Sequence, residues 1–175
     1  IVTAVGKETP LNALDGIPIT SIESPHSTTF ENIYTDAGRA QYLRAQAARV
    51  DLDTVPPLWR NASIIHLAPI ANEIDSSLPN DFSPALLGVT PQGWMRRWDS
   101  SGRVSRSEWS DSESVLHKAN AVVISREDVN GDHELIEQMA HQTRMLVVTE
   151  GAEGCVLHWN GDRRRFRAPQ VQEVD

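Results

Sequence analysis

The sequence predicts an α/β fold with a mainly parallel sheet flanked by helices and interrupted by β-hairpins. Three observations indicate this fold class. Short apolar runs rich in branched residues recur between turn signals, which is typical of buried strands. Helical patterns stand between the later runs, and such alternation favours a parallel sheet with right-handed crossovers. Two further segments carry hairpin signals and break the alternation.

The predicted strands are the apolar runs themselves. The first, fourth and fifth runs are almost wholly apolar, as expected where helices cover both faces of a parallel sheet. The first eight residues, IVTAVGKE, lack the basic start and long apolar region of a signal peptide, so we expect a strand from the middle of a domain. The five runs are residues 1–5, 63–67, 85–89, 121–125 and 146–149.

Two helices are predicted from capping residues and periodicity. Between residues 128 and 143 apolar side chains recur at helical spacing, and Asp132 can cap the N-terminus of that helix. Ser110 and Glu113 have the spacing of a capping box in front of the sequence SVLHKA, which indicates a second, shorter helix. Each helix precedes an apolar run, so the later part of the chain has the order of a βαβ unit.

Two hairpins and one short turn complete the expected elements. Residues 27–43 contain two strand-like runs around the turn Asp36-Ala37-Gly38-Arg39. In residues 155–168 the pair Asn160-Gly161 is a strong two-residue turn signal between strands. Pro56 and Pro57 indicate the start of a short helix or turn, because proline is tolerated at a first helical position.

Composition narrows the class of partner. The chain has 24 acidic and 16 basic residues and a formal charge of -8, which repels a polyanionic backbone and argues against nucleic acid as the main partner. No run approaches the roughly 18 apolar residues that a membrane helix needs, so no membrane partner is expected. The single cysteine, Cys155, excludes an internal disulfide and favours a reducing compartment. We expect it to be a buried structural thiol.

Four arginines form a local exception to the acidic character of the chain. They lie in the predicted second hairpin, where charge on an edge strand discourages pairing with another chain. We therefore favour a solvent-facing role, with anion binding as the alternative. These residues are Arg163, Arg164, Arg165 and Arg167.

The segment from Met145 to Asp175 has the order strand, glycine turn and hairpin, which resembles the region before the catalytic loop of PfkB-type, ribokinase-like carbohydrate kinases. In that family the strand ends in a Thr-x-Gly-x-x-Gly turn beside the nucleotide, and here Thr149, Gly151 and Gly154 stand at those positions. The resemblance implies that these three residues bind nucleotide. A simple tight turn between two strands is the alternative.

The family continues into an Asp-x-Thr-Gly-Ala-Gly-Asp signature whose last Asp is the catalytic base. Asp175 stands where this signature would begin, so we expect the base outside these residues and no catalytic residue within them. The sequence VVISREDV lies where the family has Asn-x-x-Glu, with Ser125 and Asp128 at the matching positions. The resemblance implies Ser125 on the phosphate side and Asp128 as a Mg²⁺ ligand through water.

The resemblance covers nearly the whole chain and sets the expected function. Residues 1–175 would form the central portion of a single ribokinase-like kinase domain, without the N-terminal Gly-Gly region and the C-terminal Gly-Ala-Gly-Asp loop. The full-length parent would use ATP and Mg²⁺ to phosphorylate a sugar or nucleoside-like hydroxyl in the cytoplasm, and this fragment alone would be inactive. Sheet edges left uncovered would be prone to associate, which leaves a homodimer open.

The alternative is a non-catalytic regulatory protein that binds nucleotide or sugar and kept the kinase fold. The replacement of the family's Asn by Ser125 points in that direction. What separates the two is whether an Asp closes the glycine loop in the full reading frame.

Two further sets of residues invite a functional interpretation. His133, Glu137 and His141 share one helix face but span about 12 Å, too far for one metal ion, so a solvated face is favoured. His66 lies in an apolar run, where a hydrogen-bonded core histidine is favoured over a pocket residue.

Trp94, Trp98 and Trp109 surround a Gly- and Ser-rich connection and could stack on a sugar or nucleobase. Packing beneath a loop is the more common role of such residues and is the one we favour.

Overall fold

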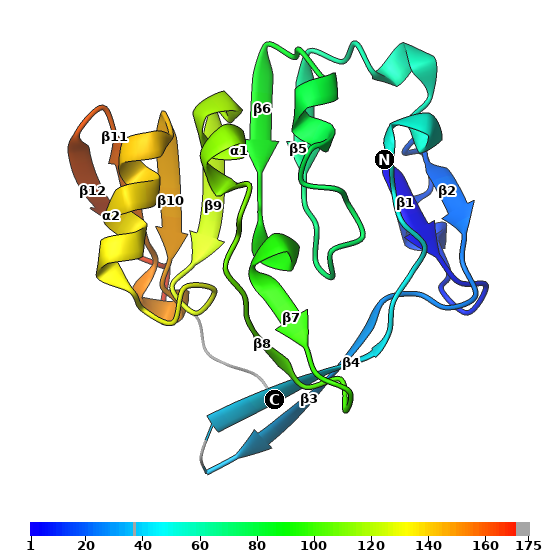
Figure 1. Ribbon diagram of the computed structural model, residues 1–175, viewed down its shortest axis with the longest axis horizontal. Coiled ribbons are helices and arrows are strands. Elements are labelled where there is room, and N and C mark those ends of the chain that lie inside the picture. The colour runs from blue at the N-terminus through cyan, green and yellow to red at the C-terminus, as the bar shows by residue number, and fades with distance from the viewer. Residues whose placement is uncertain (37, 171–175) are drawn as a thin grey trace. The chain divides into compact units, whose positions relative to one another are not determined.

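The computed structural model describes residues 1–36 and 38–170 and divides into two compact units that interleave along the chain (Figure 1). Ala37 of the predicted first turn and Asp175 lie outside the described residues. The first unit comprises Ile1–Ala62, Pro69–Ser83 and Gln92–Trp109, and the second comprises Ser63–Ala68, Pro84–Pro91 and Ser110–Asp175.

The second unit is built on a six-stranded mixed sheet with the order β12-β11-β10-β9-β6-β5. Within this sheet β5, β6, β9 and β10 are parallel to one another, whereas β11 and β12 run antiparallel to their neighbours. This confirms the prediction of a mainly parallel sheet with a hairpin. The strands are β5 (Ile64–Leu67), β6 (Leu86–Val89), β9 (Ala121–Ser125), β10 (Met145–Thr149), β11 (Cys155–Trp159) and β12 (Asp162–Phe166).

The turn between β11 and β12 has the conformation that its residues predict. Asn160 has φ 52° and Gly161 has φ 78°. Positive φ at both central positions is the requirement of a type I′ turn, which matches the twist of the flanking strands. Register follows from the turn, with Trp159 opposite Asp162 and Cys155 opposite Phe166.

Two α-helices belong to the second unit, α1 (Ser112–Lys118) and α2 (His133–Gln142). The predicted cap of α2 is confirmed, because the Asp132 carboxylate accepts a hydrogen bond from the Leu135 amide at 3.1 Å. No helix in the described part of the chain is long and apolar enough to cross a membrane.

The predicted capping box of α1 is wrong. The N-cap is Asp111 rather than Ser110, and its side chain makes no capping hydrogen bond. Its backbone has φ -92° and ψ 11° instead of the extended conformation that aims a cap side chain at the first-turn amides. The Ser114 hydroxyl instead donates to the Asp111 carbonyl at 3.1 Å.

Burial in the central strands alternates, which differs from the expectation of two fully covered faces. α1 and α2 contact each other and lie on the same side of the sheet (Figure 1). Leu146 and Val148 of β10 are 0% and 3% exposed, whereas Val147 between them is only half-buried. One face of the sheet therefore carries the hydrophobic core of this unit, and the other face is covered in part.

The first unit consists of three strand pairs and short 3₁₀ turns. The predicted first strand is confirmed as β1 (Val2–Val5), but it pairs in parallel with β2 (Thr20–Glu23) in a two-stranded sheet of its own. The predicted first hairpin is confirmed as β3 (Thr29–Thr35) and β4 (Gly38–Ala45). A further antiparallel pair, not predicted, is formed by β7 (Arg96–Trp98) and β8 (Val104–Arg106).

The short turn predicted at the two prolines is confirmed as a 3₁₀ helix over Pro57–Trp59, with proline at its start. The remaining 3₁₀ segments were not predicted. They are Asn12–Leu14, Leu52–Thr54, Leu78–Asp81, Gln92–Met95 and, in the second unit, Gly151–Glu153.

Two predicted core residues are more exposed than expected. Cys155 is half-buried rather than buried, because it lies in β11 next to the exposed edge strand β12. His66 is hydrogen-bonded as predicted, with Nε2 2.9 Å from the Thr90 hydroxyl, but its side chain is exposed. Its position in β5, the strand at the other edge of the sheet, accounts for this exposure.

His158 makes the second unit less stable in mild acid. Its side chain is 9% exposed, and burial lowers its pKa from 6.5, with Arg163 acting in the same direction and Glu137 opposing. As pH falls through 6.5 the unfolded state takes up the proton first, so the free energy of unfolding decreases until the folded-state pKa is passed. We expect His158→Gln to show a smaller decrease between pH 7.5 and 5.5 in urea titrations. Parallel curves for the two proteins would contradict this assignment.

Candidate functional site

The predicted site residues come together at the carboxyl ends of two neighbouring parallel strands. Ser125 ends β9 and Thr149 ends β10, and the two are partners in the sheet register. In open α/β sheets, ligands bind beyond the carboxyl ends of the strands. The turns that follow these strands are therefore the first candidate site.

The turn after β10 is closed by its own backbone. The Glu150 amide donates to the Gly154 carbonyl at 2.8 Å, and the Gly154 amide donates to the Gly151 carbonyl at 3.0 Å. In the part of the chain that the structure describes, the amides of Gly151 and Ala152 donate to no other residue. Two N–H groups thus remain available beside the end of β10.

The two glycines of this turn are required for different reasons. Gly154 has φ 94°, and a Cβ there would overlap the Phe166 carbonyl oxygen and the Ala168 amide. Gly151 has φ 58°, but a Cβ there would meet nothing within 4 Å. Gly154 is therefore needed for packing against the end of β12, while Gly151 leaves open space through which a ligand can approach the backbone.

The turn after β9 is held by reciprocal hydrogen bonds. The Ser125 amide donates to Asp128 Oδ2 at 2.8 Å, and the Asp128 amide donates to the Ser125 hydroxyl at 3.1 Å. The Arg126 amide donates to the Thr149 carbonyl at 2.9 Å and joins the two turns. The Thr149 hydroxyl in turn lies 3.4 Å from the Ile124 carbonyl. All five predicted site residues are thus part of two turns that hydrogen bonds join to each other.

Charged side chains that sequence reasoning did not assign to the site lie beside these turns. Glu150 Oε1 is 3.4 Å from Arg126 Nη1, and Glu150 Oε2 is 2.7 Å from Arg165 Nη2. Arg165 also lies 3.9 Å from Glu153. Among the four arginines predicted to face solvent, Arg165 is thus engaged at the turn. The sequence held no signal for this, because the partners are 15 and 24 residues from Glu150.

The exposure of the other candidates agrees with the solvated helix face and with the packing role favoured for two of the three tryptophans. His133, Glu137 and His141 have exposed side chains. Within residues 1–36 and 38–170 no group of His, Cys, Asp and Glu is arranged to hold a metal ion. Trp94 and Trp109 stack with ring centroids 5.4 Å apart, and both are buried.

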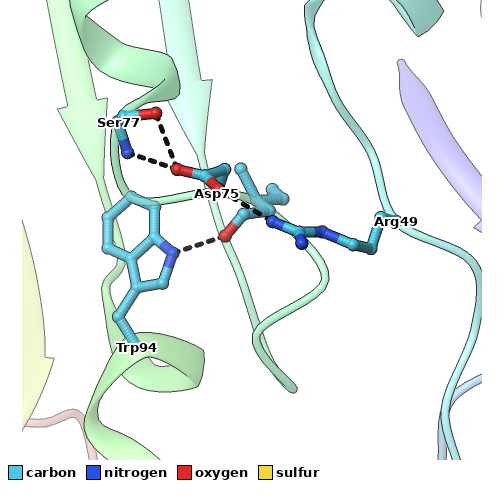
Figure 2. Close-up of polar contacts among 5 residues, drawn as sticks. Arg49, Asp75, Ser77 and Trp94 are labelled. Atoms are coloured by element: carbon cyan, nitrogen blue, oxygen red, sulfur yellow. Dashed lines mark hydrogen bonds and ion pairs between the residues drawn. The ribbon is translucent and has the colours of Figure 1, made fainter.

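A second candidate is a polar pocket of about 580 Å³ in the first unit. A smaller pocket of about 420 Å³ shares two of its lining residues, Arg49 and Asp75. Figure 2 shows the Asp75 carboxylate between Arg49 and Ser77. Its Oδ2 accepts from Arg49 at 2.8 Å, and its Oδ1 accepts from the Ser77 amide and hydroxyl at 2.9 and 2.6 Å. The Ser77 hydrogen bonds are the main cause of the lowered pKa of Asp75.

Several groups that line the larger of these two pockets are hydrogen-bonded or packed against other residues. The Trp94 indole N–H donates to the Ile74 carbonyl at 2.7 Å (Figure 2), and its ring is covered by Trp109. The Arg49 and Asp75 side chains are 66% and 47% exposed, so their ion pair adds little to stability. These contacts order the loop around Asp75.

Comparison with known proteins identifies the architecture. No family model matches the sequence, and no curated protein matches it. A sulfate complex of a pyrophosphate-dependent kinase in the ribokinase family has a TM-score of 0.75 and 14% identity, covering 98% of this chain and 65% of that one. A pyrophosphate-dependent kinase of the same family, complexed with a pyrophosphate analog and myo-inositol, has a TM-score of 0.69, 16% identity and coverages of 97% and 65%.

A nucleoside kinase from Methanocaldococcus jannaschii, an archaeal member of the ribokinase family, has a TM-score of 0.63 and 14% identity, covering 99% of this chain and 60% of that one. This chain therefore spans less than two thirds of the length of these kinases. Each match extends over nearly the whole of this chain. The chain thus has the ribokinase-like fold.

Proposed function

We propose that the full-length protein containing this chain transfers a phosphoryl group from a polyphosphate donor, ATP or pyrophosphate, to a hydroxyl of a sugar, cyclitol or nucleoside-like molecule. One observation carries the proposal. On a ribokinase-like fold, the turn Thr149–Gly154 lies beside Ser125 and Asp128 at the carboxyl ends of β9 and β10, with open space at Gly151.

The residues of this chain would bind and orient the donor. The free amides of Gly151 and Ala152 suit negatively charged oxygens, and Gly151 allows the donor to approach the backbone. Thr149 and Ser125 would offer hydroxyl oxygens from the two strand ends. Asp128 would hold Mg²⁺ through water, because Mg²⁺ in phosphoryl-transfer sites commonly keeps its waters and binds one or two carboxylates. The cation would offset the phosphate charge during transfer.

The donor and acceptor classes follow from similar kinases. A solved kinase of this fold was captured with a pyrophosphate analog and myo-inositol, and another is a nucleoside kinase. The residues at the two turns do not require the adenine or the ribose of a nucleotide donor. Both ATP and pyrophosphate therefore belong in the test.

We further propose that both units belong to a single kinase domain and that this fragment alone is inactive. The 175 residues contain no Gly-Ala-Gly-Asp sequence, and phosphoryl transfer needs a base for the acceptor hydroxyl. A cytoplasmic location would suit the one unpaired cysteine of the chain.

The second candidate is a non-catalytic protein that binds nucleotide or sugar. The observation that favours it is the Ser125 hydroxyl, which accepts from the Asp128 amide at 3.1 Å and so is engaged within its own turn. A protein of this kind would bind donor without turnover.

The deciding experiment follows phosphorus-31 NMR spectra of the full-length protein with Mg²⁺, ATP or pyrophosphate, and a panel of sugars, cyclitols and nucleosides. We expect a phosphomonoester to appear with one donor, and the 175-residue chain to produce none. Donor binding without product from any acceptor would favour the non-catalytic candidate. Turnover by the 175-residue chain would contradict the proposal that its catalytic base lies elsewhere.

A further inference from the structure

Glu150, in the turn after β10, holds two arginines from different parts of the second unit. Arg126 directly follows β9, and Arg165 lies in β12 on the hairpin. Their guanidinium groups reach the two oxygens of the same carboxylate, at 3.4 Å and 2.7 Å. The Glu150 side chain is 10% exposed, whereas the arginine side chains are 48% and 49% exposed.

This arrangement orients two cations that keep unused donors. A guanidinium has five N–H groups in a fixed plane. Among the described residues, the Arg126 guanidinium contacts Glu150 and, at 3.4 Å, His133. No described donor meets hydrogen-bond geometry at Glu150 Oε2, so its contact with Arg165 is ionic and poorly aligned. Each guanidinium therefore has N–H groups left with which to contact another anion.

Arg126 and Arg165 lie beside the turn Thr149–Gly154, whose backbone is open at Gly151. The Arg126 amide is bonded to the Thr149 carbonyl, and Glu150 is the residue between Thr149 and Gly151. A ligand that approaches the open backbone at Gly151 is therefore one residue away from the Glu150 carboxylate and the two guanidinium groups that contact it. Charge-assisted contacts from arginine to phosphate are stronger than neutral hydrogen bonds and are often bidentate.

We propose that Arg126 and Arg165 form an anion site for the terminal phosphates of the donor, and that Glu150 is an internal counter-ion which competes with the donor for their N–H groups. The chemical class of the ligand is an inorganic diphosphate or triphosphate group, with or without a nucleoside. The proposal rests on the proposed function only for the identity of the natural ligand. It assigns three residues that the family-like motif does not include.

A purely structural role for the cluster makes a different prediction. If Glu150 served only to fix the hairpin, its neutral amide would weaken anion binding or leave it unchanged. If Glu150 competes with the ligand, Glu150→Gln removes a negative charge from the site and frees both guanidinium groups. We therefore expect Glu150→Gln to bind pyrophosphate several-fold more tightly than the unchanged chain.

The test measures pyrophosphate binding to the 175-residue chain by isothermal titration calorimetry at two salt concentrations. We expect Arg126→Ala and Arg165→Ala each to weaken binding about tenfold, which is about 1.4 kcal/mol. Arg164→Ala is the matched control: this residue lies on the same strand as Arg165, its side chain is 64% exposed, and it forms an ion pair with Asp162. The control should bind within twofold of the unchanged chain, and circular dichroism checks that every variant is folded.

The outcomes separate this inference from the proposed function. Equal losses in Arg164→Ala, weaker or unchanged binding in Glu150→Gln, or no pyrophosphate binding by the unchanged chain would each overturn the anion site. None of these results depends on turnover. If the full-length protein transfers phosphate but the variants do not show the expected changes in pyrophosphate binding, the inference fails and the proposed function stands. If the variants show the expected changes in binding but the full-length protein transfers phosphate from no donor, the anion site stands and the proposed function fails.

Discussion

Replacing Gly154 with alanine is expected to lower the free energy of unfolding by about 4 kcal/mol, from backbone strain together with overpacking. Gly154 has φ 94° and ψ -126°, a conformation that side chains with a Cβ rarely adopt. The added Cβ would overlap main-chain atoms of Phe166 and Ala168, which cannot move aside as a flexible side chain can. The turn and the end of β12 would have to separate.

Gly151→Ala is the matched control for this change. Its φ of 58° lies in the left-handed region, which costs about 1–2 kcal/mol for a residue with a Cβ, and the new methyl group meets no atom within 4 Å. Urea unfolding followed by circular dichroism compares the two variants. Equal losses of stability would contradict the distinct roles given to the two glycines. In the full-length protein, Gly151→Ala should raise the donor KM, because the methyl group occupies the approach to the backbone.

Leu146→Ala is expected to lower the free energy of unfolding by about 3 kcal/mol, the usual size for a leucine that leaves a cavity in a core. Leu146 is 0% exposed in β10 and lies on the face that carries the hydrophobic core of this unit. Leu157→Ala is the matched control. It pairs with Val147, on the opposite face, and is half-buried. We expect a loss of about 1 kcal/mol there, from partial burial of the same side chain.

Thermal and urea unfolding of both leucine variants measure this difference. A similar loss for Leu146→Ala and Leu157→Ala would mean that the two faces of the sheet are equally packed. That result would contradict the alternating burial along β10 and β11.

The strands of the second unit were predictable because each is a local pattern. The runs that end at Leu67, Val89, Ser125 and Thr149 end in the structure at the same residues. Their apolar side chains are rich in branched residues, and a turn follows each run. The cap at Asp132 and the turn at Asn160-Gly161 were predictable for the same reason, since each depends on residues within a few positions of one another.

Elements that depend on distant partners were not predictable. β2 has the sequence Thr-Ser-Ile-Glu, which carries no strong strand signal, and it is ordered by pairing with β1 from Val2↔Thr20 onward. The failed capping box at Ser110 shows a second limit. Spacing alone suggested it, while the backbone at Asp111 decides where the helix begins.

The candidate site was predictable in its positions but not in its charges. The proximity of Ser125 and Thr149 follows from two parallel strands that end together. The contacts of Glu150 do not, because they join the turns after β9 and β10 to β12, which only the folded sheet brings together. Arg165 was grouped with three solvent-facing neighbours, since a strand sequence does not say which arginine meets a carboxylate from another turn.

The measurement that tests the central claim most directly is a crystal structure of the full-length protein with a donor that cannot be cleaved, the β,γ-methylene analogue of ATP or a pyrophosphate analog. The account predicts phosphate oxygens against the Gly151 and Ala152 amides, with Arg126 or Arg165 turned toward them. A donor bound in the pocket around Arg49 and Asp75, with the turn after β10 unoccupied, would contradict it.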